Sequence, residues 1–350
     1  MEILQDYDLS KLNTFSIQAN AKFFVEIKNE QELKKLFTDP IFTGNKKFFL
    51  GGGSNVLFTR DFDGIVVLNA LKGIEIVRED SESVTIRSMA GETWHDLVTF
   101  AVERGYWGIE NLSFIPGTVG AAPMQNIGAY GAELENVLED VEAAEIATGE
   151  RKVFTKEECE LGYRDSIFKN ALKGKYCITA VTIKLSKVEK KNISYKVLKE
   201  YIEEHKIDIQ TPKNVSDAVM AIRKSKLPDP NIIPNAGSFF KNIFLSKEEA
   251  KIFLAKYPEV PYFEDKARIK IPAAYLIEAC GPASPQSGGA SAASWRGYRV
   301  GNVGVHDKQA LVLVHYGGAE GGEFMNLVRE ITTSVKEKFG IELVPEVNIV

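Results

Sequence analysis

Residues 115–131 constrain the fold and chemistry of this chain more than any other segment. They read IPGTVGAAPMQNIGAYG and combine small residues with amide and hydroxyl groups, without one charged side chain. This composition suits a flat, polar ligand packed against the backbone, because glycine lets the backbone approach a ligand closely. A purely structural glycine-rich loop is the alternative, but turns alone explain a run of this length poorly.

A second glycine-rich run lies earlier in the chain, directly after a predicted strand. It reads LGGGSN over residues 50–55. Three glycines permit positive φ angles, and successive amide N–H groups can then cradle a phosphate. The run matches neither GxGxxG nor GxxxxGK[ST], the common dinucleotide and P-loop fingerprints. Taken alone, a plain tight turn explains it as well as a phosphate cradle does.

Length and charge limit the class of protein. A chain of 350 residues is expected to form two or three domains, at roughly 100–200 residues per domain. The net charge of −5 argues against a nucleic-acid partner, which would require a basic surface. The N-terminus lacks the basic start and apolar core of a signal peptide, and no apolar run is long enough for a membrane span. We therefore expect a cytoplasmic protein without a membrane partner.

The cysteines and histidines predict no metal site. Cys159, Cys177 and Cys280 are not spaced like a metal clamp or a redox pair, and the four histidines form no HExxH pair. We expect the cysteines to be buried or idle thiols in a reducing compartment.

The order of helical and strand patterns indicates an α+β protein. Strand patterns cover residues 23–27, 47–50, 64–69, 74–77, 83–88, 141–147 and 176–185, and helical patterns cover 30–37, 92–104, 195–205 and 215–225. One α+β unit leads into a second, more β-rich unit, with the main boundary near residues 187–215. The charge on one face of the last two helices is typical of a solvated surface.

Five motifs in a fixed order resemble one enzyme family. They read GGGSN, IPGTVGAAPMQNIGAYG, GYRDSIFK, GSFFKN and, near the C-terminus, PEV; GSFFKN ends the longer stretch LPDPNIIPNAGSFFKN at 227–242. Over nearly the whole chain, the sequence resembles UDP-N-acetylenolpyruvoylglucosamine reductases. Tyr195 in Ser-Tyr indicates the subtype with a tyrosine-bearing loop over the active site.

The resemblance implies a fold and a domain order. It predicts an α+β architecture with an FAD-binding domain of the vanillyl-alcohol-oxidase type, made of two α+β subdomains, followed by an α+β substrate-binding domain. Subdomain 1 is expected at residues 1–70, subdomain 2 at 71–212 and the substrate domain at 213–350. A C-terminal strand can return to subdomain 1.

The resemblance also implies an FAD-dependent oxidoreductase of peptidoglycan synthesis, and hence of cell-wall biogenesis, cell shape and cell division. NADPH would reduce non-covalently bound FAD, which would then reduce the enolpyruvyl group of UDP-N-acetylenolpyruvoylglucosamine to give UDP-N-acetylmuramate. Hydride addition leaves enolate-like charge on the substrate carboxylate, which a cation stabilises, and an acid must protonate the neighbouring carbon. The expected partners are the UDP-sugar and NADPH, and a monomer is expected.

Three residues match the catalytic positions of the family. Ser238 is the expected proton donor, although a lone serine beside glycine is otherwise a turn or cap residue. Arg164 offers a fixed charge and forked donors to the developing carboxylate charge, with a salt bridge to Asp165 or another surface acid as the alternative. Glu346 is expected to act with Arg164 on the intermediate, although the residues around it alone suggest a solvent-facing strand position.

Further residues match ligand positions of the family. Those expected at FAD are Gly51, Gly52, Gly53, Ser54, Asn55, Pro116, Gly117, Thr118, Gly120, Gln125, Asn126, Gly128, Ala129, Tyr130 and Ile178. Those expected at the UDP-sugar are Tyr195, Lys226, Asn242 and Tyr262, since lysine attracts phosphate and tyrosine both stacks and donates. His306 resembles a position near the flavin, but a structural hydrogen bond explains it equally well.

Two features depart from the family pattern. Asn348 stands two residues after Glu346, where many members carry a basic residue. Residues 282–294, PASPQSGGASAAS, look inserted, because their removal would leave an uninterrupted family sequence. The stretch contains no charged or large apolar side chain that could anchor it to a core, so we expect an exposed, mobile excursion without a catalytic group.

Two other functions are compatible with parts of the sequence. The first is another flavin enzyme, such as a sugar or alcohol oxidase, but those often attach FAD through histidine or cysteine, which the glycine-rich segments lack. The second is a nucleotide-sugar binding protein without turnover. Retention of Arg164, Ser238 and Glu346 argues against it.

Overall fold

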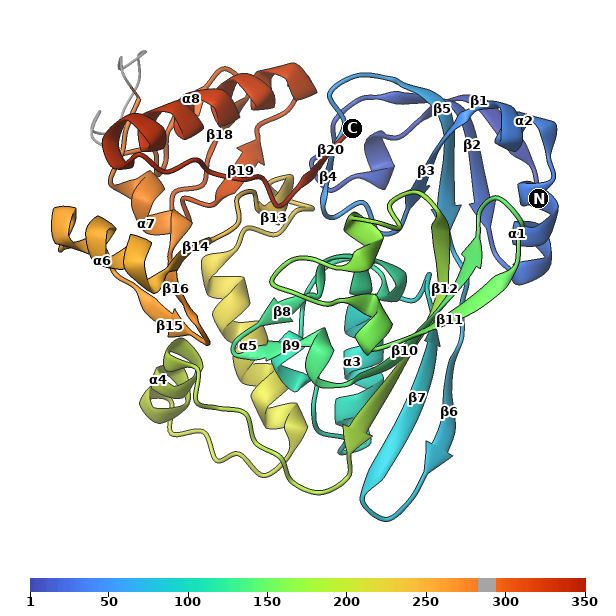
Figure 1. Cartoon of the computed structure of the whole chain (residues 1–350), viewed down its shortest axis with the longest axis horizontal. Helices are drawn as coiled ribbons and strands as arrows, with labels where there is room; N and C mark the ends of the chain where they lie inside the picture. The colour runs from blue at the N-terminus through green and yellow to red at the C-terminus, as the bar shows by residue number, and fades with distance from the viewer. Residues whose placement is uncertain (283–293) are drawn as a thin grey trace. The chain divides into compact units, whose positions relative to one another are not determined.

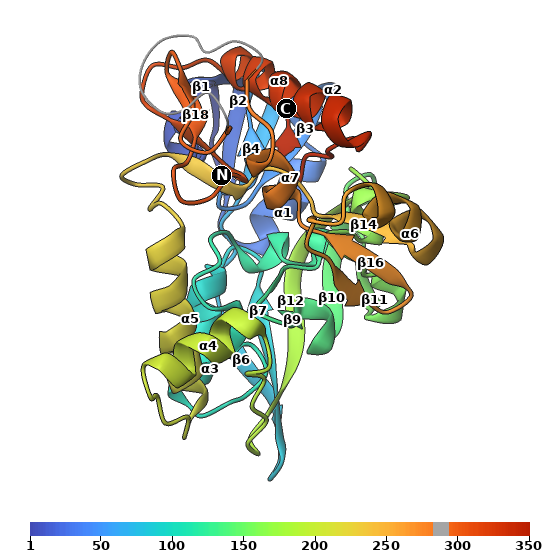
Figure 2. The same ribbon diagram turned by 90° about the vertical axis from the view of Figure 1, so that its left-hand side faces the viewer.

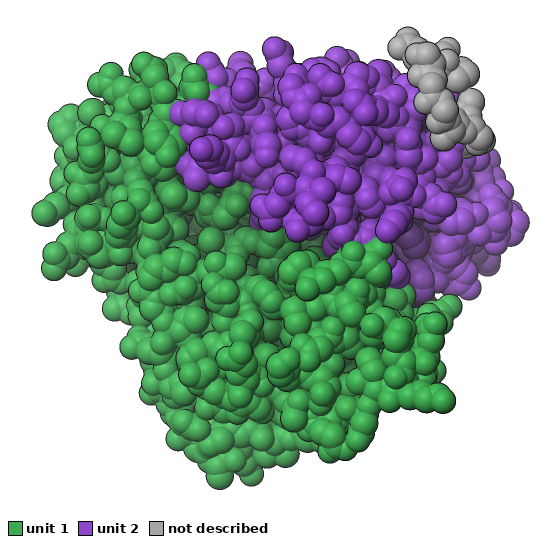
Figure 3. Space-filling model, turned by 180° about the vertical axis from the view of Figure 1, so that it is seen from behind, with its two compact units in different colours: residues 1–7, 20–53, 62–225 green, residues 8–19, 54–61, 226–350 purple. Residues whose placement is uncertain are grey.

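The computed structural model describes residues 1–282 and 294–350 (Figure 1). The chain forms two compact units, coloured separately in Figure 3. Unit 1 consists of residues 1–7, 20–53 and 62–225, and unit 2 of residues 8–19, 54–61 and 226–350. No helix of the described chain is both long enough and apolar enough to cross a membrane.

The first sheet of unit 1 has the strand order β1-β2-β5-β3. Its strands are β1 (Ile3–Asp8), β2 (Asn20–Ile27), β5 (Phe62–Asn69) and β3 (Lys46–Leu50), and β5 pairs in parallel with both β2 and β3. Helix α1 (Glu30–Phe37) packs here because Leu33, Leu36 and Phe37 recur on one face. Asn29 begins the helix by accepting the Glu32 N–H at 2.9 Å. The short helix α2 (Pro40–Gly44) follows.

The second sheet of unit 1 is antiparallel, with the order β11-β10-β12-β7-β6. It comprises β6 (Ile74–Glu79), β7 (Ser83–Met89), β10 (Leu138–Glu145), β11 (Arg151–Thr155) and β12 (Tyr176–Ser186). Helix α3 (Trp94–Glu103) shares a hydrophobic core with these strands. Trp94 is almost fully buried, and its indole donates to the Leu112 carbonyl at 2.9 Å. Between α3 and β10 the chain forms short 3-10 turns and the small hairpin β8 (Gly128–Ala129) and β9 (Ala132–Glu133).

Two helices complete unit 1. Helices α4 (Lys196–Glu204) and α5 (Pro212–Lys226) bury apolar residues in one cluster around Trp107. The cluster includes Leu198, Val215, Val219 and Ile222. Because of this packing, α5 belongs to unit 1 up to residue 225. The sequence predicted instead that the substrate domain starts at residue 213.

The described residues of unit 2 form two small sheets and a strand pair. One sheet orders β13 (Asn235–Ser238), β19 (Val312–His315), β18 (Val303–Val305) and β17 (Arg299–Val300), and α8 (Gly321–Phe339) contacts β18 (Figure 2). The other orders β14 (Ile243–Ser246), β16 (Arg268–Ile271) and β15 (Phe263–Asp265), with α6 (Lys247–Lys256) against it and α7 (Ala273–Glu278) after it. The terminal strand β20 (Asn348–Ile349) pairs in parallel with β4 (Val56–Leu57).

Every helix and strand expected from sequence periodicity is present, with shifts of a few residues at the ends. The α+β class is therefore confirmed. The division of residues 1–212 into two subdomains at residue 70 stays a prediction, although the two sheets of unit 1 lie on either side of that position. β20 pairs with residues of the range assigned to subdomain 1, as the prediction allowed.

The predicted insert falls largely outside the described residues, so its conformation and its lack of function stay predictions. Its flanks are described. The Trp295 N–H donates to the Cys280 carbonyl at 3.0 Å, so the two ends of the insert lie close together. Trp295 is itself almost fully buried, and its indole donates to the Ser334 hydroxyl at 2.8 Å.

The three cysteines are buried and free. Burial raises the pKa of the Cys159 and Cys177 thiols to about 12, which makes both unreactive at neutral pH. The prediction of buried thiols is thus confirmed.

Candidate active site

The two glycine-rich segments face each other within unit 1. A Cβ atom on Gly51 would collide with the Thr118 hydroxyl, and one on Gly52 would lie 3.0 Å from the Gly117 Cα. Gly53 and Gly117 have φ angles of +62° and +115°, which side-chain-bearing residues rarely adopt. The glycines therefore permit a close backbone approach that joins the two predicted cofactor segments.

The second segment is also fixed to the turn that begins α3. The Trp94 N–H donates to the Gly117 carbonyl at 3.0 Å, and the Gly120 N–H donates to the Ala90 carbonyl at 2.8 Å. Ala90 in turn donates to the carbonyl of Thr179 on β12 at 2.8 Å. This places the segment beside Ile178, whose carbonyl accepts from Asn69 at 2.8 Å.

Asn126 organises the middle of the glycine-rich segment from a fully buried position. Its backbone is left-handed, with φ +42°, a conformation that asparagine tolerates better than most residues. Its amide nitrogen donates to Glu133 and to the Gly162 carbonyl, each at 3.2 Å. Its amide oxygen accepts the Glu135 N–H at 3.0 Å. The side chain thus fixes the loop.

Arg164 lies against this segment. Its guanidinium donates to the Gly128 carbonyl at 2.7 Å and to the Asn126 carbonyl at 3.4 Å. The residue has φ +52°, so its backbone occupies a conformation of higher energy than a helix or strand. Asp165, the alternative partner considered from sequence, accepts two hydrogen bonds from Asn170 at 3.1 Å. The structure therefore directs the cation toward the glycine-rich segment.

A second guanidinium and two aromatic rings lie near the same segment. The Tyr130 and Tyr195 rings meet edge to face, with centroids 5.6 Å apart. The Arg223 Nε donates to the Phe114 carbonyl at 3.1 Å. Burial lowers the pKa of Arg223, and the charge of Arg164 lowers it further, so the two cations are close enough to repel. Within the described residues Arg223 makes no ion pair. The positive charge of Arg223 suits an anionic ligand.

Arg223 is not among the residues predicted from the sequence, because charge on one face of such a helix is typical of a solvated surface. Its only sequence signal is that it lies one helical turn from the apolar Val219 and beside the buried Ile222. The buried Asn111, in the 3-10 turn at Glu110–Leu112, was not predicted either, because its residue type alone offers no signal.

His95 anchors the chain just before the glycine-rich segment. Its Nδ1 accepts the Phe114 N–H at 3.2 Å, which requires that this nitrogen carries no proton. Burial lowers the pKa of His95 below its usual 6.5, with Lys224 and Arg223 acting in the same direction and Asp96 opposing them. Neutral imidazole is therefore the form that stabilises Phe114.

This histidine makes stability depend on pH. Below pH 6.5 the unfolded chain protonates His95 while the folded chain resists, so stability is lost as the pH falls from 6.5 toward the folded pKa. We expect His95→Asn, whose amide oxygen can accept the same N–H without titrating, to flatten the decline in unfolding free energy over this range. Urea titrations of both proteins between pH 7.5 and 5 test this, and parallel curves would contradict it.

Unit 2 brings together the other two predicted catalytic residues. Ser238 ends β13, and the next residue, Phe239, accepts the Glu346 N–H on its carbonyl at 2.7 Å. An antiparallel bridge between Phe240 and Pro345 continues this pairing. Glu346 is half-buried at a bend before β20, so the suggestion of a solvent-facing strand residue is wrong.

The end of the first glycine-rich run reaches the same place. Asn55 donates to the Glu346 carbonyl at 3.3 Å, and its own carbonyl accepts from the Asn348 side chain at 2.9 Å. Asn348 thereby fills a structural role at the position where the family often has a basic residue. Ser54 and Asn55 belong to unit 2, whereas Gly51, Gly52 and Gly53 belong to unit 1.

The predicted sugar ligands are spread over both units. Tyr195 lies in unit 1, and Lys226, Asn242 and Tyr262 lie in unit 2. Lys226 and Tyr262 are exposed, while Asn242 is half-buried and accepts the Ala273 N–H at 3.1 Å. His306 is buried and accepts the Lys308 N–H on its Nδ1 at 3.3 Å, which favours the structural explanation for that residue.

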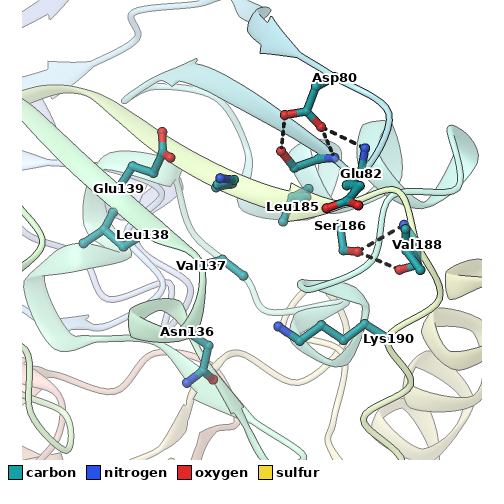
Figure 4. Close-up of a pocket in the computed structure, with 12 residues that line it drawn as sticks. Asp80, Glu82, Asn136, Val137, Leu138, Glu139, Leu185, Ser186, Val188 and Lys190 are labelled. Carbon is teal, nitrogen blue, oxygen red and sulfur yellow. Dashed lines mark hydrogen bonds between the residues drawn. The ribbon is translucent and has the colours of Figure 1, made fainter.

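A surface groove of about 700 Å³ lies elsewhere in unit 1 (Figure 4). It is lined by residues 80, 82, 83, 136–139, 184–186, 188 and 190, which include no predicted site residue. The Asp80 carboxylate there accepts the N–H groups of Glu82 and Ser83 at 2.8 and 2.7 Å, so it holds a hairpin turn. We do not assign this groove to the active site.

The glycine-rich segments define the class of protein. A family model described as an FAD binding domain matches residues 21–155, which span both segments. A second model, the C-terminal domain of UDP-N-acetylenolpyruvoylglucosamine reductase, matches residues 229–350. The protein is an FAD-dependent oxidoreductase.

Comparison with whole proteins narrows this class. The chain is 46% identical over 351 residues to the UDP-N-acetylenolpyruvoylglucosamine reductase of Amoebophilus asiaticus, and 44% over 352 residues to that of Flavobacterium johnsoniae, each alignment covering both chains completely. A crystal structure of the Thermus caldophilus enzyme shares the fold, with a TM-score of 0.64 and 22% identity over 99% of this chain and 98% of that one. This chain belongs to the UDP-N-acetylenolpyruvoylglucosamine reductase family.

Proposed function

We propose that this enzyme reduces the enolpyruvyl group of UDP-N-acetylenolpyruvoylglucosamine with NADPH and yields UDP-N-acetylmuramate for peptidoglycan synthesis. The observation that carries the proposal is the identity of 44–46% over the complete length of two proteins named UDP-N-acetylenolpyruvoylglucosamine reductase. The protein acts in the cytoplasm as a monomer, without nucleic-acid or membrane partners. Its free, buried thiols fit a reducing compartment.

FAD is held without a covalent bond, by Gly51–Asn55 and residues 116–130. The support is the close approach of Gly51 and Gly52 to Gly117 and Thr118, which leaves backbone N–H groups in the place of side chains. FAD bound there would supply the hydride, received from NADPH. Within this segment Asn126 also shapes the loop, because its side chain is fully buried and hydrogen-bonded.

The catalytic groups have separate tasks. Arg164 stabilises the negative charge that develops on the substrate carboxylate after hydride addition. Glu346, half-buried and fixed through its N–H to Phe239, acts with Arg164 on this intermediate. The Ser238 hydroxyl then transfers a proton to the neighbouring carbon. Lys226, Asn242, Tyr195 and Tyr262 bind the UDP-sugar.

A two-step anaerobic experiment tests the function. The purified protein is reduced with NADPH until the yellow colour bleaches, and UDP-N-acetylenolpyruvoylglucosamine is then added. We expect the sugar to reoxidise the flavin with formation of UDP-N-acetylmuramate. Bleaching without reoxidation by the sugar would contradict the proposed substrate, and reoxidation by oxygen alone would favour an oxidase.

Gly52→Ala tests the proposed flavin cradle. The added methyl group would press on the Gly117 backbone at 3.0 Å and force the two segments apart. Such overpacking costs ~1–3 kcal/mol, so we expect flavin affinity to fall by about one to two orders of magnitude. Fluorescence titration of the apoprotein with FAD measures this. Gly44→Ala is the control, since among the described residues no atom outside its own helix and chain neighbours lies within 4 Å of its Cβ, and equal loss in both variants would argue against the cradle.

A further inference from the structure

Asn111 joins two separate segments of unit 1 near the proposed site. It lies in the 3-10 turn η2 (Glu110–Leu112) and is 1% exposed. Its amide nitrogen donates to the Tyr130 carbonyl and to the Asn192 carbonyl, both at 2.8 Å. One amide nitrogen carries two hydrogens, so each carbonyl receives one of them.

Asn192 returns a hydrogen bond to the same turn. Its side chain donates to the Gly131 carbonyl at 3.1 Å, one residue beyond the carbonyl that Asn111 holds. We call these three hydrogen bonds of Asn111 and Asn192 the amide clamp. The clamp ties residues 130–131, the end of the glycine-rich segment, to the chain just before α4.

The clamped chain carries Tyr195. Residues 187–194 form no helix or strand, so regular backbone pairing does not hold them in place. Tyr195 is 41% exposed and touches the same turn through its edge-to-face contact with Tyr130. A Cβ on Gly131 would lie 3.6 Å from the Tyr195 Cβ, so the turn and the tyrosine backbone are in close proximity. A shift at Asn192 would therefore move Tyr195.

One polar atom of the clamp lies in an unfavourable environment. The Asn111 amide oxygen is buried and has no hydrogen-bond partner within residues 1–282 and 294–350. Buried polar atoms without a partner are rare in folded proteins and require an explanation. Something must offset the cost of burying this unpaired oxygen. The two hydrogen bonds that the Asn111 amide nitrogen donates are interactions that an apolar residue of the same size could not make.

We propose that Asn111 is a positioning residue that places Tyr195 for binding of the UDP-sugar. This inference rests on the proposed function in one respect, because it requires that Tyr195 contacts this substrate. Because Asn111 is buried, it acts through Tyr195 rather than on a ligand directly. Its hydrogen bond to the Asn192 carbonyl ties the 187–194 segment to the turn that its second hydrogen bond, to Tyr130, holds. The segment is thereby ordered before the sugar arrives, which lowers the entropy lost on binding.

Asn111→Leu tests the proposal, because leucine has a similar size but no donors. We expect faster hydrogen exchange in residues 187–195 and a rise of about tenfold in KM for the sugar, at an unchanged flavin content and kcat. Asn111→Asp should raise the exchange rate and KM at least as much, since its carboxylate oxygens would face two carbonyl oxygens. Asn45→Leu is the matched control: its amide also donates to a backbone carbonyl, that of Ile41, at 2.8 Å, and we expect no change in KM.

A double variant separates positioning from general destabilisation. If Asn111 acts through Tyr195, then Asn111→Leu should add almost nothing to the rise in KM that Tyr195→Ala causes. Additive effects, or unchanged exchange in residues 187–195, would overturn the proposal. Should Asn111→Leu not fold, Asn192→Ala removes one bond of the clamp and is expected to change exchange and KM in the same direction. The exchange measurement needs no turnover, so it distinguishes failure of the clamp from failure of the proposed function.

Discussion

Ser238→Ala is expected to accept hydride from NADPH at a near-normal rate but to be reoxidised by the UDP-sugar ~10²–10⁴-fold more slowly. The reason is the order of events, since the proposed proton transfer from Ser238 follows hydride transfer to the sugar. Stopped-flow absorbance of the flavin under anaerobic conditions measures the two half-reactions separately.

The surroundings of Ser238 make the alanine variant a clean test. Its strand is held by backbone bonds, with Phe239 donating to the Leu311 carbonyl at 2.7 Å and accepting from Glu346 at 2.7 Å, so removal of the hydroxyl leaves the pairing intact. Ser238→Cys, which retains an ionisable proton, should recover part of the rate. Equal slowing of both half-reactions in the alanine variant would remove the proton-donor assignment and leave a binding role.

Arg164→Met is expected to slow reoxidation by the sugar about 10²–10³-fold, because it removes the cation proposed to stabilise the developing carboxylate charge. Methionine is unbranched at Cβ and so tolerates the left-handed backbone of this position better than a β-branched residue would. Arg164→Lys should be intermediate, since an ammonium keeps the charge but cannot reproduce the fork that reaches the Gly128 and Asn126 carbonyls.

Flavin content decides how the Arg164 variants are interpreted. The Arg164 guanidinium also donates hydrogen bonds to the glycine-rich segment. Loss of FAD from a variant would therefore indicate a changed segment structure rather than a lost catalytic group. Arg104→Met is the matched control: Arg104, the residue directly after α3, likewise donates to a backbone carbonyl, that of Phe100, at 3.0 Å, and we expect normal turnover. Normal reoxidation by Arg164→Met with FAD bound would contradict the catalytic role.

The secondary structure was predictable because its causes are local. Leu33, Leu36 and Phe37 fall on one face of a helix only at a period near 3.6, and that helix begins and ends where the pattern does. The boundary after α5 was less predictable. It depends on the packing of Val215, Val219 and Ile222 around Trp107, a residue more than one hundred positions earlier in the chain.

The sequence by itself determined the α+β class, the two glycine-rich segments and the identity of the three candidate catalytic residues, since each depends on residue type and order. Only the tertiary structure decided which of these segments and residues lie next to one another. It placed Gly52 against Gly117, and Glu346 beside Phe239, because backbone hydrogen bonds between distant segments depend on the whole fold. It also decided the burial of Arg223 and the clamp of Asn111, because the environment of a polar side chain is set by the elements packed around it and not by its neighbours in sequence.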